Sequence, residues 1–266
     1  MIRLVVTAED FGASAPSDLR TLEAHRKGIV TSVSLLGNCE DLAHAVALLK
    51  DVPGLGVGLS LALVGGRPTL PSGDVPSLVK PTGAFRTSSV DFAVDWWSGA
   101  ISSVEVEREL AAQITRARDV GLNIEHLSTV GHLGLLPGVG AIIERLAKRF
   151  GIAGLRTAVE PPGLGWVAEP QRGLEAAVLS GLSWLTRRKL GTLRHGPITW
   201  GYIESGRLDE VRILEIIGRL GAGSHELLCH PGAADTDGEL HALTSTKVKN
   251  AIADRGILLG RWRDQV

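Results

Sequence analysis

Two adjacent acids follow the first apolar run of the chain. The segment Thr-Ala-Glu-Asp-Phe-Gly at residues 7–12 places Glu9 and Asp10 directly after it, and α/β folds keep their chemistry at the carboxyl ends of parallel strands. One acid of such a pair can hold a metal ion while the other takes a proton from water, because crowding two carboxylates drives their pKa values apart. A solvated turn before Gly12, with Asp10 bonded to the local backbone, is the alternative that these residues leave open.

The segment Cys-His-Pro-Gly at residues 229–232 offers a second candidate at the end of another apolar run. A strand that ends there would deliver His230 to the same edge as the two acids, and Pro231 and Gly232 would turn the chain away at once. An imidazole that titrates near neutral pH can protonate a leaving amine, so His230 is a candidate general acid. A histidine that merely closes the end of the strand is the structural alternative.

Short apolar runs alternate along the chain with amphipathic ones, an order typical of a parallel sheet covered by helices. Strands are expected at residues 4–7, 32–36, 56–61, 126–130, 154–156 and 226–229. Helices are expected at residues 16–27, 42–50, 104–120, 139–150, 208–220 and 245–254, the third with Ser103 as its N-cap. One α/β barrel of roughly 250 residues would use the whole chain, so we predict a single domain over residues 1–266.

Composition excludes several classes of partner. The formal net charge of -1 and the pI near 6.7 give no long-range attraction to nucleic acid or to an anionic membrane. No apolar window approaches the roughly 20 residues of a membrane span, and the first apolar run is too short for a signal peptide. The 2 cysteines fit a reducing compartment. We therefore expect a cytoplasmic protein with a small polar ligand, and formation of a homodimer stays open.

Two segments interrupt the alternation, at about residues 65–89 and 161–203. Long insertions on a barrel usually lie over the active-site face. The second segment carries the aromatic residues Trp166, Trp184, Trp200 and Tyr202. Their rings could stack on a sugar or could anchor the loop to the core, and the sequence favours neither.

Several short motifs occur in a fixed order over nearly the whole chain. They are Thr-Ala-Glu-Asp-Phe-Gly at 7–12, Gly-Ile-Val-Thr-Ser at 28–32, Val-Gly-Leu at 57–59, His-Leu at 126–127, Leu-Arg at 155–156, Cys-His-Pro-Gly at 229–232 and Leu-Thr-Ser at 243–245. In this order they resemble the YdjC family, the ChbG/HpnK-type carbohydrate deacetylases. The resemblance implies a distorted (β/α) barrel, TIM-like and related to polysaccharide deacetylases. It also implies metal-dependent removal of acetyl groups from N-acetylated sugars.

The resemblance assigns roles to individual residues. The family has two aspartates in its first motif, the first as base and the second as metal ligand, so Glu9 has the base position here and Asp10 the ligand position. The two metal-binding histidines of the family correspond to Ser60 and Val130. A neutral hydroxyl is a poor substitute for imidazole and valine has no lone pair. The divalent metal that the family uses, zinc or magnesium, is therefore not expected, and no cofactor is predicted.

Two other histidines remain near the altered third motif. Alternation along the strand at 126–130 puts His126 on the same face as Val130, and His132 follows in the turn. A rebuilt metal site of Asp10, His126 and His132 is one alternative, but we favour both histidines as contacts of a substrate. The other residues predicted to contact the substrate are Arg156, Trp200 and Ser60.

These observations predict an enzyme whose catalytic residues are Glu9, Asp10 and His230. Glu9 and His230 would exchange protons with a small sugar-like or natural-product substrate, while Asp10 would tune Glu9. Deacetylation without the metal would lack the activated water and the Lewis acid that polarises the amide carbonyl. The alternatives are a metal-independent isomerase, lyase or cyclase in a biosynthetic pathway, and a catalytically silent barrel that binds a ligand or a protein.

Overall fold

The computed structural model describes residues 1–156, 161, 177, 180–181, 194–195, 197–232 and 237–264. The strands are β1 (Ile2–Phe11), β2 (Ser32–Leu36), β3 (Gly56–Leu61), β4 (His126–Thr129), β5 (Gly154–Leu155), β6 (Arg194–His195), β7 (Ile198–Trp200), β8 (Gly223–Cys229) and β9 (Ile257–Leu259). The α-helices are α1 (Ala15–Lys27), α2 (Leu42–Lys50), α3 (Ser89–Trp97), α4 (Ser103–Asp119), α5 (Val139–Arg149), α8 (Glu210–Arg219), α9 (Asp237–Thr244) and α10 (Thr246–Asp254). Short 3₁₀ helices are η1 (Ser72–Asp74), η2 (Val130–Leu135) and η3 (Trp262–Asp264).

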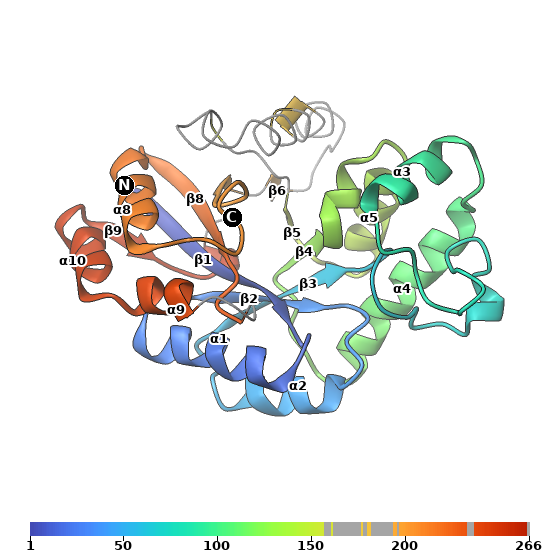
Figure 1. Cartoon of the computed structure of the whole chain (residues 1–266), viewed down its shortest axis with the longest axis horizontal. Coiled ribbons are helices and arrows are strands. Elements are labelled where there is room, and N and C mark those ends of the chain that lie inside the picture. Colours follow the sequence, from blue (N-terminus) through green and yellow to red (C-terminus); the bar gives the residue numbers. More distant parts are fainter. Residues whose placement is uncertain are drawn as a thin grey trace.

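A parallel sheet forms the centre of the molecule (Figure 1). Its strands lie in the order β6-β5-β4-β3-β2-β1-β8-β7, and β9 pairs with β1. The start of β1, from Ile2 to Leu4, pairs with β9, and its end, from Thr7 to Phe11, pairs with β2 along the same edge. β8 follows the opposite edge from Ile2 to Ala8. The carboxyl end of β1 is therefore held between β2 and β8.

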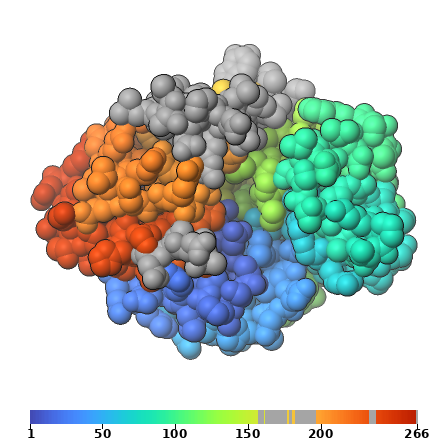
Figure 2. Space-filling model, viewed as in Figure 1, coloured from blue at the N-terminus to red at the C-terminus, as the bar shows by residue number. Residues whose placement is uncertain are grey.

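The sheet is curved into an incomplete barrel with helices on its outside (Figure 1). In the described part of the chain β6 and β7 stand at the two ends of the strand order and do not pair with each other. Figure 2 shows the viewed face hollowed between the orange and red elements on the left and the green and teal elements on the right. The predicted distorted (β/α) barrel is confirmed.

Most predicted elements are found, β2 and β3 at the predicted bounds. The N-cap of α4 is Ser102 rather than the predicted Ser103, since the Ser102 hydroxyl accepts the N–H of Glu105. The elements that the sequence does not predict are β6, β7, β9, α3 and α9. These strands are too short to show an alternating pattern, and α3 turns apolar side chains toward solvent, which obscures its amphipathic pattern.

The predicted insertion at residues 65–89 packs against α4, where Glu109 accepts two of its backbone N–H groups at 2.8 and 3.0 Å. Most of the second predicted insertion, at residues 161–203, lies outside the described residues, and so do Trp166 and Trp184. Within the described ranges, no helix has both the length and the apolar character that a bilayer crossing needs.

The C-terminal segment fills the amino-terminal end of the barrel with Trp262. This side chain is fully buried and stacks on the ring of His126, with the ring centroids 4.2 Å apart. Its indole N–H donates a hydrogen bond of 2.9 Å to Glu226 in β8. The end of the chain therefore completes the interior between β4 and β8.

Replacement of Trp262 tests this packing. We expect Trp262→Ala to lower the free energy of unfolding by about 3–5 kcal/mol, because a large buried ring is removed. Trp262→Phe should cost about 1–3 kcal/mol, since the ring remains but Glu226 loses one donor. Urea unfolding measures both values. Val211→Ala, at a side chain that is 72% exposed on α8, is the control, and a Trp262→Ala loss as small as that of the control would contradict the assignment.

Candidate active site

The two acids at the end of β1 have different surroundings. The carboxylate of Glu9 accepts a hydrogen bond of 2.7 Å from Nη1 of Arg156, in an ion pair that is partly open to solvent. Asp10 is exposed and has a left-handed backbone, with φ of 59°. Its carbonyl accepts the N–H of Ala13 at 3.1 Å, which starts the turn into α1. The sequence suggests Asp10 as the partner of Glu9, whereas in the structure the partner of Glu9 is Arg156.

Arg156 lies in the barrel interior immediately after β5 and joins two carboxylates. In addition to Glu9, it contacts Glu226 through Nε at 2.9 Å and through Nη2 at 2.6 Å. Burial alone would lower the pKa of Arg156, but the charges of Glu226 and Glu9 and their hydrogen bonds raise it. The guanidinium is therefore a permanent cation that fixes the direction of the Glu9 carboxylate.

Glu226 is a site residue that the sequence analysis missed. Its fully buried carboxylate accepts hydrogen bonds from the Thr7 hydroxyl at 2.7 Å and from Trp262 at 2.9 Å, besides the two from Arg156. Four donors satisfy a charge that burial would otherwise make costly. The sequence does contain a signal for this residue, because Glu226 begins the apolar run Glu-Leu-Leu-Cys of β8. A glutamate that is buried in such a strand almost always has a charged or hydrogen-bonding partner.

His132 faces the same region from η2. Gly131 and His132 both have left-handed backbones, with φ of 62° and 56°, and the His132 ring meets Tyr202 edge-on at 4.9 Å between centroids. Burial, then the charges of Arg156 and His230, lower the pKa of His132 to about 4. His132 is therefore neutral at physiological pH and can donate or accept a hydrogen bond.

His230 follows β8, as the sequence predicts, and its ring is held by a neighbouring loop. Either ring nitrogen lies within 3.2–3.3 Å of the Ser205 hydroxyl. The backbone N–H of His230 donates to the buried carboxylate of Glu239 in α9, a second residue that the sequence did not reveal. Burial raises the pKa of Glu239 even though the backbone N–H group and the charge of His230 oppose this.

A cavity of about 510 Å³ opens beside Asp10. Val130 lines it with Asp10, and the rest of its lining comes from the start of α1, the segment after β2 and the turn at Gly65 and Gly66. Ser60 lies in the interior of the sheet, at the register position of Leu36 in β2. The hydrocarbon side chain of Val130, which the resemblance aligns with a metal-binding histidine, therefore lines the cavity beside Asp10.

The donor set around Asp10 does not fit the metal ion that the resemblance implies. A zinc-like ion needs at least three protein ligands at a catalytic site, and the corresponding positions hold one carboxylate, one hydroxyl and one valine. Among the described residues, no group of three or more His, Cys, Asp or Glu side chains is arranged to hold a metal. The rebuilt set of Asp10, His126 and His132 is not assembled either.

Like Arg156 and Ser60, the predicted substrate contacts His126 and Trp200 lie in the interior. His126 is fully buried against Trp262, and burial and the charge of Arg156 hold its pKa well below the usual value. Trp200 is only 4% exposed, and its indole N–H donates to Nδ1 of His225 at 3.2 Å. Both side chains pack the scaffold in this structure, because the strands β4 and β7 turn them into the core.

Glu9 at the end of β1 and His230 directly after β8 lie at the carboxyl ends of neighbouring strands of an incomplete parallel barrel, which is where barrel enzymes carry their active sites. The chain belongs to the family described as YdjC-like protein, which it matches over residues 3–254. It is 37% identical over 182 residues to a carbohydrate deacetylase of Brevibacillus brevis, which is 68% of each chain. It is 31% identical over 273 residues to a carbohydrate deacetylase of Geobacillus stearothermophilus, covering 98% of this chain and 96% of the relative.

Solved structures show the same fold. A crystal structure of an Enterococcus faecalis protein named for cellobiose-phosphate cleavage matches 99% of this chain and 98% of its own, with a TM-score of 0.80 and 23% identity. A family 4 carbohydrate esterase from Streptomyces lividans, in complex with acetate, matches 97% of this chain and 91% of its own, with a TM-score of 0.51 and 11% identity. The predicted relation to the deacetylase type of barrel is confirmed at the level of fold.

The low pKa of His132 predicts a pH-dependent stability. Its folded pKa of about 4 lies below the value of about 6.5 for an unfolded chain, so between these values the unfolded chain binds a proton that the folded chain does not. The free energy of unfolding should therefore fall as the pH is lowered from 6.5 toward 4. The His132→Asn variant, whose asparagine tolerates a left-handed backbone, lacks this titration. Between pH 6.5 and pH 5 its free energy of unfolding should therefore fall by on the order of 1–2 kcal/mol less than that of the unaltered chain.

Urea unfolding at a series of pH values measures the effect. His241→Asn, at an exposed histidine of α9, is the matched control and should leave the pH dependence as it is in the unaltered chain. Parallel curves for the unaltered chain and His132→Asn would show that His132 titrates alike in the folded and unfolded states.

Proposed function

We propose that the chain is an enzyme that moves protons on a small sugar-like substrate, with Glu9 as base and His230 as acid. The observation that carries this proposal is the pairing of Glu9 with Arg156 at 2.7 Å, at the carboxyl end of β1. A carboxylate that is fixed in direction by a buried cation, yet 15% exposed, is suited to accept a proton from a bound molecule. An ion pair that only stabilised the fold would not need a carboxylate that solvent can reach, as solvent reaches Glu9 here.

His230 supplies the second half of the proton transfer. It comes from β8, the neighbour of β1, and Ser205 and Glu239 restrain its ring and its backbone. A base and an acid on adjacent strands can take a proton from one atom of a substrate and give a proton to another. His132, which is neutral, can hold a polar substrate group between them without adding charge.

The substrate class follows from the family. Its curated relatives are named carbohydrate deacetylases, so a sugar-like molecule is the ligand that we propose for the cavity beside Asp10. We propose further that the family's metal ion has no part in this chain's reaction, because Ser60 and Val130 cannot supply the two missing imidazoles. Proton transfer by Glu9 and His230 is the chemistry that the remaining residues support.

Variants of the two residues test the assignment. A panel of N-acetylated and unacetylated sugars and short oligosaccharides is incubated with the protein, and products are identified by mass spectrometry. On the substrate found, Glu9→Gln and His230→Ala should each lower kcat by roughly a hundredfold or more, with substrate affinity largely kept. Glu23→Gln and His241→Ala, at partly exposed and exposed positions of α1 and α9, are the matched controls. Full activity in both site variants would refute the assignment.

Metal content tests the second part of the proposal. We expect the purified protein to hold far less than one zinc, magnesium or similar ion per chain by elemental analysis, and a chelator to leave its activity unchanged. Restoring both imidazoles in Ser60→His with Val130→His should create zinc binding, and adding Asp10→Ala should abolish it again. About one tightly held ion per unaltered chain, lost in Asp10→Ala, would overturn the proposal and favour metal-dependent deacetylation.

A further inference from the structure

A serine hydroxyl lies against the ring of His230. β7 and β8 are parallel neighbours, with Trp200 at the register position of Leu227, so the loop after β7 and the residue after β8 meet at one edge of the sheet. Ser205, on that loop, has its hydroxyl 3.2 Å from Nε2 and 3.3 Å from Nδ1 of His230. In either tautomer of the ring, a nitrogen without a proton is therefore within reach of the Ser205 O–H. A serine whose proton can pass to an imidazole is an activated nucleophile.

The loop of Ser205 is held close to β8 by a glycine. Gly201 has a left-handed backbone, with φ of 87°. A Cβ at this position would lie 2.6 Å from the carbonyl oxygen of Leu228 in β8, so only glycine allows the close approach. The N–H of Ser205 donates to the carbonyl of Tyr202 at 3.2 Å, which closes the turn. Ser205 and His230 are both half-buried, so a small molecule can reach the pair from solvent.

Glu239 in α9 supports the histidine of this pair. Its buried carboxylate accepts the backbone N–H of His230, and attraction between the two side chains lowers the pKa of Glu239 against the effect of burial. The same attraction favours the imidazolium form that His230 takes on when it accepts the proton of Ser205. Glu239 contacts the backbone of His230 rather than its ring, so it is a positioning residue.

We propose that Ser205 is a nucleophile that takes an acetyl group from an ester or amide of a sugar, with His230 as its base. The Ser205 oxygen bonds to the acyl carbon and its proton passes to His230. The bond from that carbon to the leaving amine or alcohol then breaks, and the leaving group takes the proton from His230. In the second half, water adds to the acetyl-serine and gives a proton to His230, which returns it to Ser205 as acetate leaves.

This covalent route supplies what the altered metal position cannot. Deacetylation by direct attack of water relies on a metal to activate that water, whereas here the chain itself provides the nucleophile. His132, which burial keeps neutral, meets Tyr202 of the same loop and can donate its ring N–H to the oxygen that becomes negative during attack. The inference rests on the proposed function for the role of His230 and for the sugar, and it does not require Glu9.

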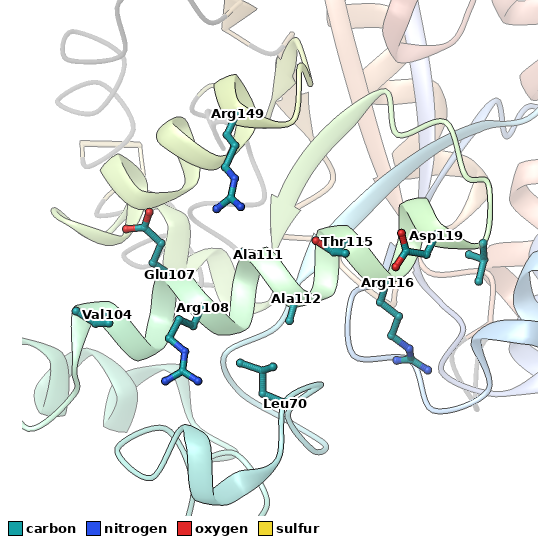
Figure 3. A pocket seen from close by; sticks show the side chains of 11 residues that line it. Leu70, Val104, Glu107, Arg108, Ala111, Ala112, Thr115, Arg116, Asp119 and Arg149 are labelled. Atoms are coloured by element: carbon teal, nitrogen blue, oxygen red, sulfur yellow. The ribbon is translucent and has the colours of Figure 1, made fainter.

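A larger cavity elsewhere lacks such a pair. About 770 Å³ of space runs along α4, lined by side chains of that helix with Leu70 and Arg149 (Figure 3). Thr115 brings a hydroxyl to it, but the described residues that line this cavity include no histidine to take the proton of a threonine. Acyl transfer to a side chain is therefore assigned to the edge of the barrel rather than to the surface of α4.

A fluorophosphonate, which phosphonylates activated serines with loss of fluoride, tests the nucleophile without a known sugar substrate. We expect the full chain to take up the label at Ser205, located by mass spectrometry of its peptides. Ser205→Ala should abolish this labelling, and His230→Ala should slow it by at least about a hundredfold, because the base is lost. Ser98→Ala and His241→Ala, at exposed positions of the chain, are the matched controls and should label like the unaltered protein. Thermal unfolding verifies that each variant is folded.

An activated acetyl ester tests the acyl step itself. With p-nitrophenyl acetate we expect a burst of nitrophenol and, after an acid quench, an acetyl group on Ser205. An unmodified Ser205 with both reagents would overturn the inference, as would labelling that His230→Ala leaves unchanged. Acetylation of Ser205 in the Glu9→Gln variant would support it whatever that variant does to a sugar. If Ser205 stays unmodified while Glu9→Gln still lowers turnover of a sugar, this inference fails and the proposed function stands.

Discussion

Arg156 carries a positive charge into the interior of the barrel, where its side chain is only 3% exposed. Removal of a guanidinium from water costs several kcal/mol, which only close and well-oriented carboxylates can offset. Glu226 meets this condition from β8 and Glu9 from the end of β1. Loss of any one partner would leave a buried charge unbalanced, so these contacts fix β1, β5 and β8 in one arrangement.

The same contacts join distant parts of the sequence to the site. Glu226 also takes hydrogen bonds from Thr7 and from Trp262, and Trp262 lies close to the end of the chain. The carboxylate of Glu226 therefore connects four parts of the chain, namely β1, the end of β5, β8 and the C-terminal segment. A change at Trp262 can therefore reach Glu9 through Glu226 and Arg156, although Trp262 itself does not touch Glu9 in this chain of contacts.

The sequence predicts local structure well and long-range pairing poorly. Apolar periodicity and cap residues locate β2, β3 and most helices within a residue or two, because these signals are local. Spacing also places Glu9 and His230 at strand ends, since both follow apolar runs directly. The partner of Glu9 was not predictable in this way, because Arg156 lies 147 residues further along the chain. The interior position of His126 involves Trp262, which stacks on its ring from the other end of the sequence, and that of Trp200 involves His225 in β8.

The two carboxylates that Arg156 joins differ in how far the structure encloses them. Glu9 and Glu226 bring two negative charges, Arg156 brings one positive charge, and the low pKa values of His126 and His132 leave both imidazoles neutral. One negative charge is therefore in excess. Glu226 is buried and satisfied by four donors, whereas Glu9 is 15% exposed and, within the described part of the chain, pairs with Arg156 alone. The open side of Glu9 is therefore the part of this cluster that a bound molecule could reach, and the role proposed for Glu9 depends on this difference between the two carboxylates.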